Sequence, residues 1–191
     1  MSVDVSSEAP PTRPAAPAHI ETSRLRLVAW RPEDASALRA VLDANDAHLR
    51  PWIPFMQHEP RTLDGTRAMI AQMQQAFVQG TAYRWALWCA SHINLYGEVM
   101  LIDRGEAGSL ELGYWMASSV VGRGLATEAA RRISQVALRD LGAQTVRIRC
   151  DVKNAASNAV AAKLGAVRIG QERVHDVLPG LLQLWQLEAP V

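Results

Sequence analysis

The chain has 191 residues, of which 49% are hydrophobic and 20% are charged, and its formal net charge is +1. This balance is that of an ordinary globular protein, and the length allows one domain with a full hydrophobic core. The small net charge gives no reason to expect a nucleic-acid or membrane surface. No signal peptide and no membrane-spanning apolar run is apparent, so we expect a cytoplasmic protein with Cys89 and Cys150 as free thiols.

The first part of the chain is predicted to lack regular structure. Residues 1–19 are rich in proline, serine and alanine and show no hydrophobic periodicity, so we expect a mobile tail. A single domain is predicted over residues 20–191. Alternating apolar residues predict its first strand at residues 25–29, and Pro32 opens a helix.

The rest of the chain shows both the helical and the strand period. Residues 48–56 contain two prolines, which exclude a continuous helix there. A helix over residues 62–79 precedes three strands with turn-rich connections, which favours an antiparallel meander. The strands are predicted at 83–90, 95–102 and 110–117. A helix from residue 125, a strand at 146–151, a helix at 155–164 and strands at 167–171 and 181–187 complete the order.

A glycine-bearing loop at residues 118–124 joins a predicted strand to a predicted helix. The N-terminus of a helix offers unpaired backbone N–H groups and the positive end of the helix dipole to an anion. Gly122 and Gly124 lack a Cβ, so the backbone can turn tightly and approach a ligand closely. The sequence of this loop matches neither the three-glycine fingerprint of dinucleotide-binding proteins nor a P-loop. The sequence therefore predicts a diphosphate-binding loop of another kind.

Residues 120–129, VVGRGLATEA, resemble the acetyl-coenzyme A loop of the GNAT superfamily of N-acetyltransferases. In that family the motif Gln/Arg-x-x-Gly-x-Gly/Ala is often followed by Ala-Thr-Glu-Ala. The Gln/Arg position falls on Ser119, which removes a long polar side chain but leaves the backbone donors. Residues 154–166, NAASNAVAAKLGA, resemble the Asn-x-x-Ser…Lys-Leu-Gly-Phe run of the same superfamily, with Ala166 in place of the aromatic residue.

Three further phrases resemble the Rim-type branch of this superfamily, which includes the acetyltransferases of ribosomal-protein N-termini and relatives with other substrates. They are TSRLRL at residues 22–27, RPEDA at 31–35 and the proline-tryptophan segment at 48–56. The resemblance implies an α/β (α+β) GNAT fold with a mixed, mostly antiparallel central sheet and helices on both faces. It also implies acetyl-CoA as co-substrate and no metal.

The same resemblance implies which residues bind the cofactor. The strand before the loop is expected to splay from its neighbour, and its free backbone groups would then bind the pantetheine arm. The cofactor-binding residues implied by the two motifs and this strand are Tyr114, Trp115, Met116, Val121, Gly122, Arg123, Gly124, Leu125, Ala126, Thr127, Asn154, Ser157 and Lys163.

Acetyl transfer to an amine requires a neutral amine, a donor for the oxyanion and a proton or hydrogen bond for the departing thiolate. Glu111, on the strand before the loop, is the predicted base, although a solvent-facing edge charge explains it equally well. Glu98, on the neighbouring strand, is the alternative and is expected near the acceptor. Ser157 is predicted to serve the thiolate, or else is a plain helix-turn serine. Trp52 and Phe55 either wall the acceptor site or fill the core.

The predicted function is an acetyl-CoA-dependent N-acetyltransferase in which a primary amine attacks the thioester directly. The acceptor can be a protein N-terminus, an amino acid or an antibiotic-like small molecule, and no nucleic acid or membrane is expected as a partner. Two alternatives stay open: a catalytically silent acyl-CoA-binding or regulatory domain, and a transferase for a larger acyl-CoA. The oligomeric state also stays open, with a homodimer as one alternative.

Overall fold

The computed structural model describes residues 14–175 and 178–188. The strands are β1 (His19–Glu21), β2 (Leu25–Ala29), β3 (Ala82–Cys89), β4 (Leu95–Ile102), β5 (Ser109–Met116), β6 (Thr145–Asp151), β7 (Val167–Val174) and β8 (Gly180–Glu188). The helices are α1 (Ala35–Ala44), α2 (Asp46–Leu49), α3 (Leu63–Gln79), α4 (Leu125–Gln135), which continues as a π-helical turn to Asp140, and α5 (Ala155–Leu164).

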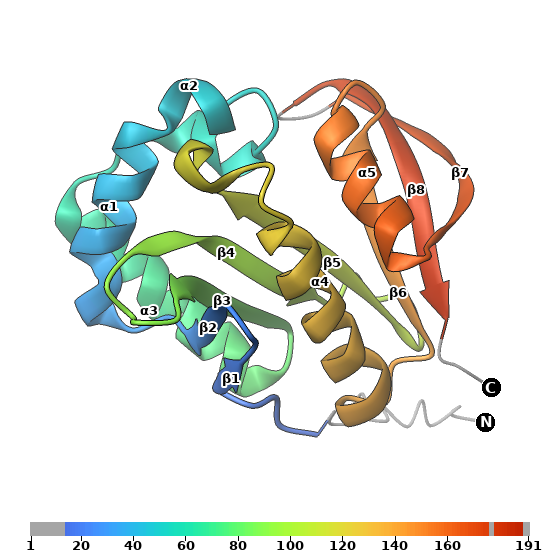
Figure 1. Ribbon diagram of the computed structural model, residues 1–191, viewed down its shortest axis with the longest axis horizontal. Coiled ribbons are helices and arrows are strands. Elements are labelled where there is room, and N and C mark those ends of the chain that lie inside the picture. Colours follow the sequence, from blue (N-terminus) through green and yellow to red (C-terminus); the bar gives the residue numbers. More distant parts are fainter. Residues whose placement is uncertain (1–13, 176–177, 189–191) are drawn as a thin grey trace, which may run out of the picture.

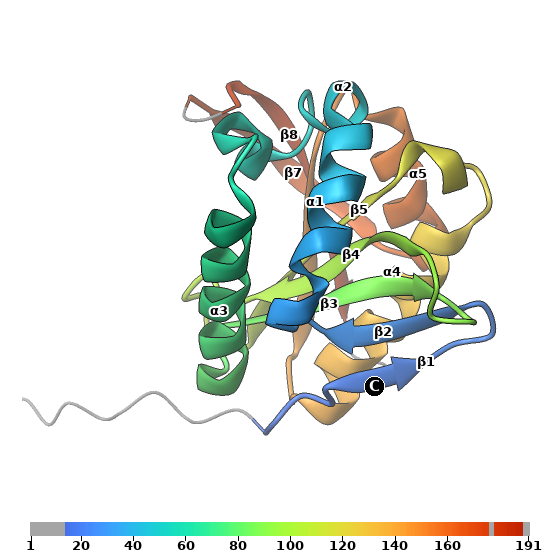
Figure 2. The same cartoon turned by 90° about the vertical axis from the view of Figure 1, so that its left-hand side faces the viewer.

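The strands form one sheet in the order β1-β2-β3-β4-β5-β6-β8-β7. Within the described residues the β5–β6 pair is parallel and the other neighbouring pairs are antiparallel. Figures 1 and 2 show α4 and α5 on one side of this sheet, with α1 and α3 on the other. The predicted mixed, mostly antiparallel sheet with helices on both faces is confirmed.

Each face of the sheet has its own core. Leu125, Ala129 and Ile133 recur at helical spacing along α4 and are buried together with the strand residues of that face. On the opposite face, Leu38 of α1 and Ile70 of α3 are buried in a second core. Because one face of each helix is buried, its apolar residues recur at helical spacing, and this spacing is what predicted the helices from the sequence.

The segment with two prolines is not a continuous helix, as the sequence predicted, because α2 ends at Leu49 and a separate 3₁₀ turn covers Pro54–His58. The N-terminal boundary differs from the sequence prediction. The indole N–H of Trp85 donates to the carbonyl of Pro17 at 2.9 Å, and β1 begins at His19. The tail predicted for residues 1–19 therefore ends earlier than expected, and residues 1–13 lie outside the described part of the chain.

The one parallel pairing, between β5 and β6, is short. Its register contains three residue pairs, of which the last is Glu111 with Arg147. Beyond that point β5 stays paired with β4 as far as Met116, while β6 stays paired with β8 as far as Asp151. The two strands therefore diverge, and the β5 edge over residues 112–116 has no ladder with β6. This divergence, which we call the splay, positions the candidate site.

Candidate active site

The loop that follows β5 lies open at the N-terminus of α4. Val121, Gly122, Arg123 and Gly124 are all exposed. Gly122 and Gly124 have φ angles of 76° and 74°, in the left-handed region that favours glycine. Within α4 the first backbone hydrogen bond is donated by the N–H of Glu128 to the carbonyl of Gly124 at 3.0 Å. The N–H groups of residues 125–127 precede that bond, so the helix itself leaves them available to an anion.

The start of this loop is fixed by a buried asparagine at the end of α1. The side-chain oxygen of Asn45 accepts from the backbone N–H and from the hydroxyl of Ser118, both at 2.8 Å. The amide of Asn45 in turn donates to the carbonyl of Val41 at 2.8 Å. Because Asn45 is 7% exposed, these bonds satisfy groups that water barely reaches, and they tie the loop to α1.

Inside the splay, a tyrosine of β5 contacts a serine of α5. The phenol oxygen of Tyr114 lies 3.0 Å from the hydroxyl oxygen of Ser157 and donates to the carbonyl of Ser157 at 3.1 Å. Asn154 caps α5, since its side-chain oxygen accepts from the backbone N–H of Ser157 at 3.0 Å. Ser157 is thus held in the first turn of α5 and faces β5.

A second asparagine locks α5 against the strands beside the splay. The side-chain amide of Asn158 donates to the carbonyls of Asp151 and Asn154, both at 2.9 Å. Its oxygen accepts from the indole N–H of Trp185 on β8 at 3.0 Å. The neighbouring residue, Ser157, therefore lies on a helix turn whose position relative to β6 and β8 is set by two of these hydrogen bonds, those with Asp151 and Trp185.

The surroundings of Tyr114 and Cys150 in the splay raise the pKa of each side chain further above neutral pH. Burial raises the pKa of Tyr114 to about 12, although the hydrogen bond with Ser157 acts in the opposite direction. Burial likewise raises the pKa of the Cys150 thiol, against smaller opposing effects of Ser157 and Trp185. At neutral pH the splay therefore presents a neutral phenol and a neutral thiol. Tyr114 can donate a proton or a hydrogen bond there.

The contact of the Tyr114 side chain with Ser157 was not predicted from the sequence, which assigned this residue only backbone contacts to the cofactor. The signal was the alternation of Leu110, Leu112 and Tyr114 along β5. The two leucines belong to the core under α4, so the third member of the series faces the same helices.

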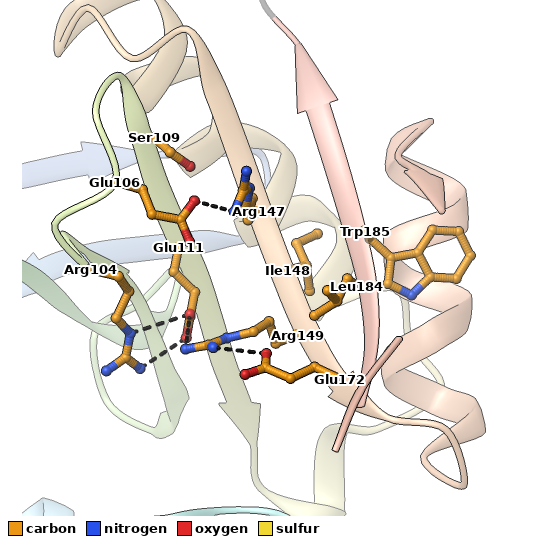
Figure 3. Close-up of a pocket in the computed structure, with 10 residues that line it drawn as sticks. All are labelled: Arg104, Glu106, Ser109, Glu111, Arg147, Ile148, Arg149, Glu172, Leu184 and Trp185. Atoms are coloured by element: carbon orange, nitrogen blue, oxygen red, sulfur yellow. Dashed lines mark hydrogen bonds and ion pairs between the residues drawn. The ribbon is translucent and has the colours of Figure 1, made fainter. Parts of the chain in front are cut away.

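Glu111 and Ser157, the two predicted catalytic residues, are not brought together. Glu111 lies between Leu110 and Leu112 and so faces the other side of the sheet. Its carboxylate is 3.0 Å from Arg104 and 2.6 Å from Arg149, in a pocket that also contains Glu106 and Glu172 (Figure 3). Two guanidinium groups therefore hold Glu111, and they must loosen before it can take a proton.

The residues predicted near the acceptor have different environments. Glu98 is 2% exposed and accepts from the indole N–H of Trp30 at 2.6 Å and from Arg84 at 2.8 Å. It is a paired, buried carboxylate in the core on the α1 and α3 side. Phe55 packs against that same core, which fits its core-filling alternative, whereas Trp52 is 39% exposed.

The remaining cofactor residues divide into side chains that are available and side chains that are buried. Gly124, Thr127 and Lys163 line one shallow groove along α4 together with Arg131, whose guanidinium donates to the carbonyl of Lys163 at 2.8 Å. This basic lining suits a phosphate. The side chains of Leu125, Trp115 and Met116, by contrast, are buried, so these three residues can contribute only backbone groups to a ligand.

Among residues 14–175 and 178–188, which the structure describes, no three histidine, cysteine, aspartate or glutamate side chains lie together as a set that could hold a metal ion. No helix in this part of the chain is long and apolar enough to cross a membrane.

The fold and the loop define an acetyltransferase class. The family model described as "Acetyltransferase (GNAT) domain" matches residues 24–167, and the chain belongs to this family. It is an acetyl-CoA-dependent N-acetyltransferase. The Bacillus subtilis (strain 168) protein named "Putative ribosomal N-acetyltransferase YdaF" is 29% identical over 146 residues, which cover 74% of this chain and 77% of that protein.

Solved structures of similar fold include two complexes, one with coenzyme A and one with acetyl-CoA. A RimL ribosomal L7/L12 alpha-N-protein acetyltransferase in complex with coenzyme A has a TM-score of 0.81 and 19% identity, covering 89% of this chain and 97% of its own. The microcin C7 self-immunity acetyltransferase MccE, in complex with acetyl-CoA and AMP, has a TM-score of 0.80 and 18% identity, covering 91% and 98%. At this identity the two structures support the fold.

The glycine loop generates a direct prediction. Gly124→Val should weaken binding of acetyl-CoA, because a β-branched side chain would stand where the loop backbone is open, at a φ that such a residue rarely adopts. Gly142→Val is the matched control, since Gly142 has a φ of 68°, has open space around its Cβ position and lies after α4. Calorimetric titration should show weaker binding for Gly124→Val alone. Equal affinities in the two folded variants would remove the loop assignment.

Proposed function

We propose that this protein transfers an acetyl group from acetyl-CoA to a primary amine by direct attack of the amine on the thioester. The observation that carries the proposal is the splay of β5 from β6, with the exposed glycine loop at one end and the Tyr114–Ser157 contact inside it. An extended pantetheine arm along β5 would supply amides for the strand edge that lacks a β6 ladder. The diphosphate would then reach the N-terminus of α4.

In this reaction the amine nitrogen bonds to the thioester carbonyl carbon, and the bond from that carbon to sulfur breaks. The departing thiolate has a thiol pKa of about 8.5 and gains from a proton or a hydrogen bond. We assign this role to Ser157, whose hydroxyl contacts the protonated phenol of Tyr114. The pair can donate to sulfur while Tyr114 stays neutral.

The amine must lose a proton, and Glu111 is the proposed acceptor of that proton. The pair of Glu111 with Arg147 is the last one before the strands diverge, so the carboxylate lies at the closed end of the splay. The pocket beside it lies on the face away from α4, where an acceptor would approach without meeting the cofactor loop. Arg104 and Arg149 would have to release part of their contact during the transfer.

For the acceptor we propose a protein N-terminus first, of the kind that ribosomal proteins present. The names of the relative from Bacillus subtilis and of the RimL structure support this choice. An α-amino group has a pKa of about 8, so a substantial neutral fraction exists near neutral pH, which reduces the work required of a base. A lysine side chain, with a pKa of about 10.4, would make a greater demand.

A donor and acceptor screen tests the proposed function. The protein should release free coenzyme A from acetyl-CoA in the presence of peptides with free N-terminal alanine or serine, and mass spectrometry should show one added acetyl group on each peptide. N-terminally blocked peptides are the control. Binding of acetyl-CoA without transfer to any amine would favour the silent-domain alternative. Faster transfer from succinyl-CoA than from acetyl-CoA would favour a larger acyl donor.

Ser157→Ala and Tyr114→Phe should both lower the rate at saturating acetyl-CoA while leaving its affinity nearly unchanged, because the lost contact is strongest when sulfur carries charge. The stability loss for Ser157→Ala should stay within about 1 kcal/mol. With an acyl donor whose thiol leaves more readily, the two variants should lose less rate than they lose with acetyl-CoA. Tyr96→Phe on β4 is the control. Equal losses for both donors would show that Ser157 does not serve the leaving group.

Glu111→Gln should lower kcat/KM by a factor on the order of 10² to 10⁴, the range typical for loss of a general base, while acetyl-CoA affinity is retained. The acidic limb of the pH profile should disappear. Glu106→Gln is the matched control, because Glu106 lies in the same pocket and pairs with Arg147. If Glu111→Gln keeps the acidic limb, or loses no more rate than the control, then another group takes the proton.

A further inference from the structure

The strongest convergence of polar groups around the glycine loop lies outside the splay, on one carboxylate of α4. Glu128 is in the first turn of this helix and its side chain is 16% exposed. One oxygen accepts from the hydroxyls of Thr22 and Ser23 at 2.6 and 3.1 Å and from the backbone N–H of Arg24 at 3.0 Å. The other accepts from Nε of Arg24 at 2.6 Å, and Nη2 of Arg24 is also at 2.6 Å.

Arg24 also reaches past the carboxylate to the loop itself. Its Nη1 donates to the backbone carbonyl of Arg123 at 2.8 Å. In a planar trans peptide the C=O and the following N–H point in opposite directions. Fixing the Arg123 carbonyl toward Arg24 therefore directs the N–H of Gly124 away from Arg24. The segment from Thr22 to Arg24 and the carboxylate of Glu128 together form what we call the Glu128 clamp.

We propose that the Glu128 clamp is a positioning device for acetyl-CoA: it holds the peptide between Arg123 and Gly124 in the orientation in which the loop binds the diphosphate. The inference rests on the proposed function, since it assumes that the loop takes this ligand. It adds residues 22–24, which lie outside both the glycine motif and the splay, and it gives a role to Glu128 at the end of that motif. The clamp joins the turn between β1 and β2 to α4 across more than one hundred residues of sequence.

Electrostatics provide a reason for the pairing of charges in the clamp. A free carboxylate in the first turn of α4 would favour the helix dipole but repel a diphosphate bound one turn away. The guanidinium of Arg24 neutralises that charge where it arises. Burial alone would raise the pKa of Glu128, but the hydrogen bonds from Thr22 and Arg24 outweigh it and hold the pKa below its usual range. The carboxylate therefore stays ionised and bound.

Glu128→Gln distinguishes a positioning role of Glu128 from a purely electrostatic one, because the two roles predict changes of acetyl-CoA affinity in opposite directions. The substitution keeps the shape of the side chain and removes one negative charge close to the anion site. If Glu128 acts only through its charge, acetyl-CoA should bind more tightly in the variant. If Glu128 positions the loop, binding should weaken by about tenfold, the scale of one hydrogen bond to a charged group.

Arg24→Lys completes the comparison. Lysine keeps the positive charge but lacks the fork that binds the carboxylate and the Arg123 carbonyl together. The clamp predicts a loss of about tenfold in acetyl-CoA affinity for this variant too. The double variant with Glu128→Gln and Arg24→Lys should bind acetyl-CoA no more weakly than the weaker of the two single variants, because both changes break the same set of contacts. Direct contact of Arg24 with the diphosphate would instead give additive losses and a mild effect of lysine.

The experiment measures acetyl-CoA affinity by calorimetry, and kcat and KM for both substrates, well below the melting temperature of every variant. The KM for acetyl-CoA should rise in proportion to Kd, with kcat and the amine KM unchanged. Asp64→Asn, which breaks an exposed ion pair with Arg67 on α3, is the isosteric control and should change nothing. Thr22→Val removes one hydrogen-bond donor to Glu128 and should weaken acetyl-CoA binding less than Glu128→Gln or Arg24→Lys does. It is the variant to measure if those two fail to fold.

The outcomes separate this inference from the proposed function. Weaker binding in Glu128→Gln and Arg24→Lys with non-additive coupling supports the clamp. Unchanged or tighter binding in Glu128→Gln, in a wild-type protein that binds acetyl-CoA, overturns the clamp and leaves the proposed function intact. A wild-type protein that does not bind acetyl-CoA overturns both.

Discussion

The structure depends on the divergence of β5 from β6 beyond the pair of Glu111 with Arg147. Each strand keeps a full ladder on its other side, with β4 and with β8, so the opening leaves both strands supported. The helix α5 bridges the two diverging strands on one face of the sheet, because Tyr114 of β5 contacts Ser157 and Asn158 ties α5 to β6 and β8. The glycine loop then lies where β5 ends and α4 begins, which joins a strand edge to an anion site.

The charges around this opening are arranged so that its interior is neutral. Three carboxylates are each bound by arginine: Glu98 by Arg84, Glu111 by Arg104 and Arg149, and Glu128 by Arg24. In the splay, burial raises the pKa of Tyr114 and of Cys150 further above neutral pH, so both side chains are uncharged. A neutral amine and a thioester would therefore meet in surroundings without a fixed net charge. The basic groups lie along α4, where phosphates are expected.

Features fixed by neighbouring residues were predictable, and features fixed by distant ones were not. The helix that begins at residue 125 and the two glycines of its loop are local features, and the sequence predicted both. The partner of Tyr114 lies 43 residues away and the partner of Thr22 lies 106 residues away, so no local pattern revealed either contact. The contact of Arg149 with Glu111 was missed for the same reason, since β5 and β6 meet only after the α4 crossover.

The central claim is that the cofactor occupies the splay, with its diphosphate at the N-terminus of α4. The most direct test is a titration of isotopically labelled protein with coenzyme A, followed through the backbone amide resonances. The account predicts that the largest shifts map to residues 112–116 of β5, to residues 121–127 and to the first turn of α5. Shifts confined to the pocket around Glu111, or spread over α1 and α3 without the loop, would contradict it.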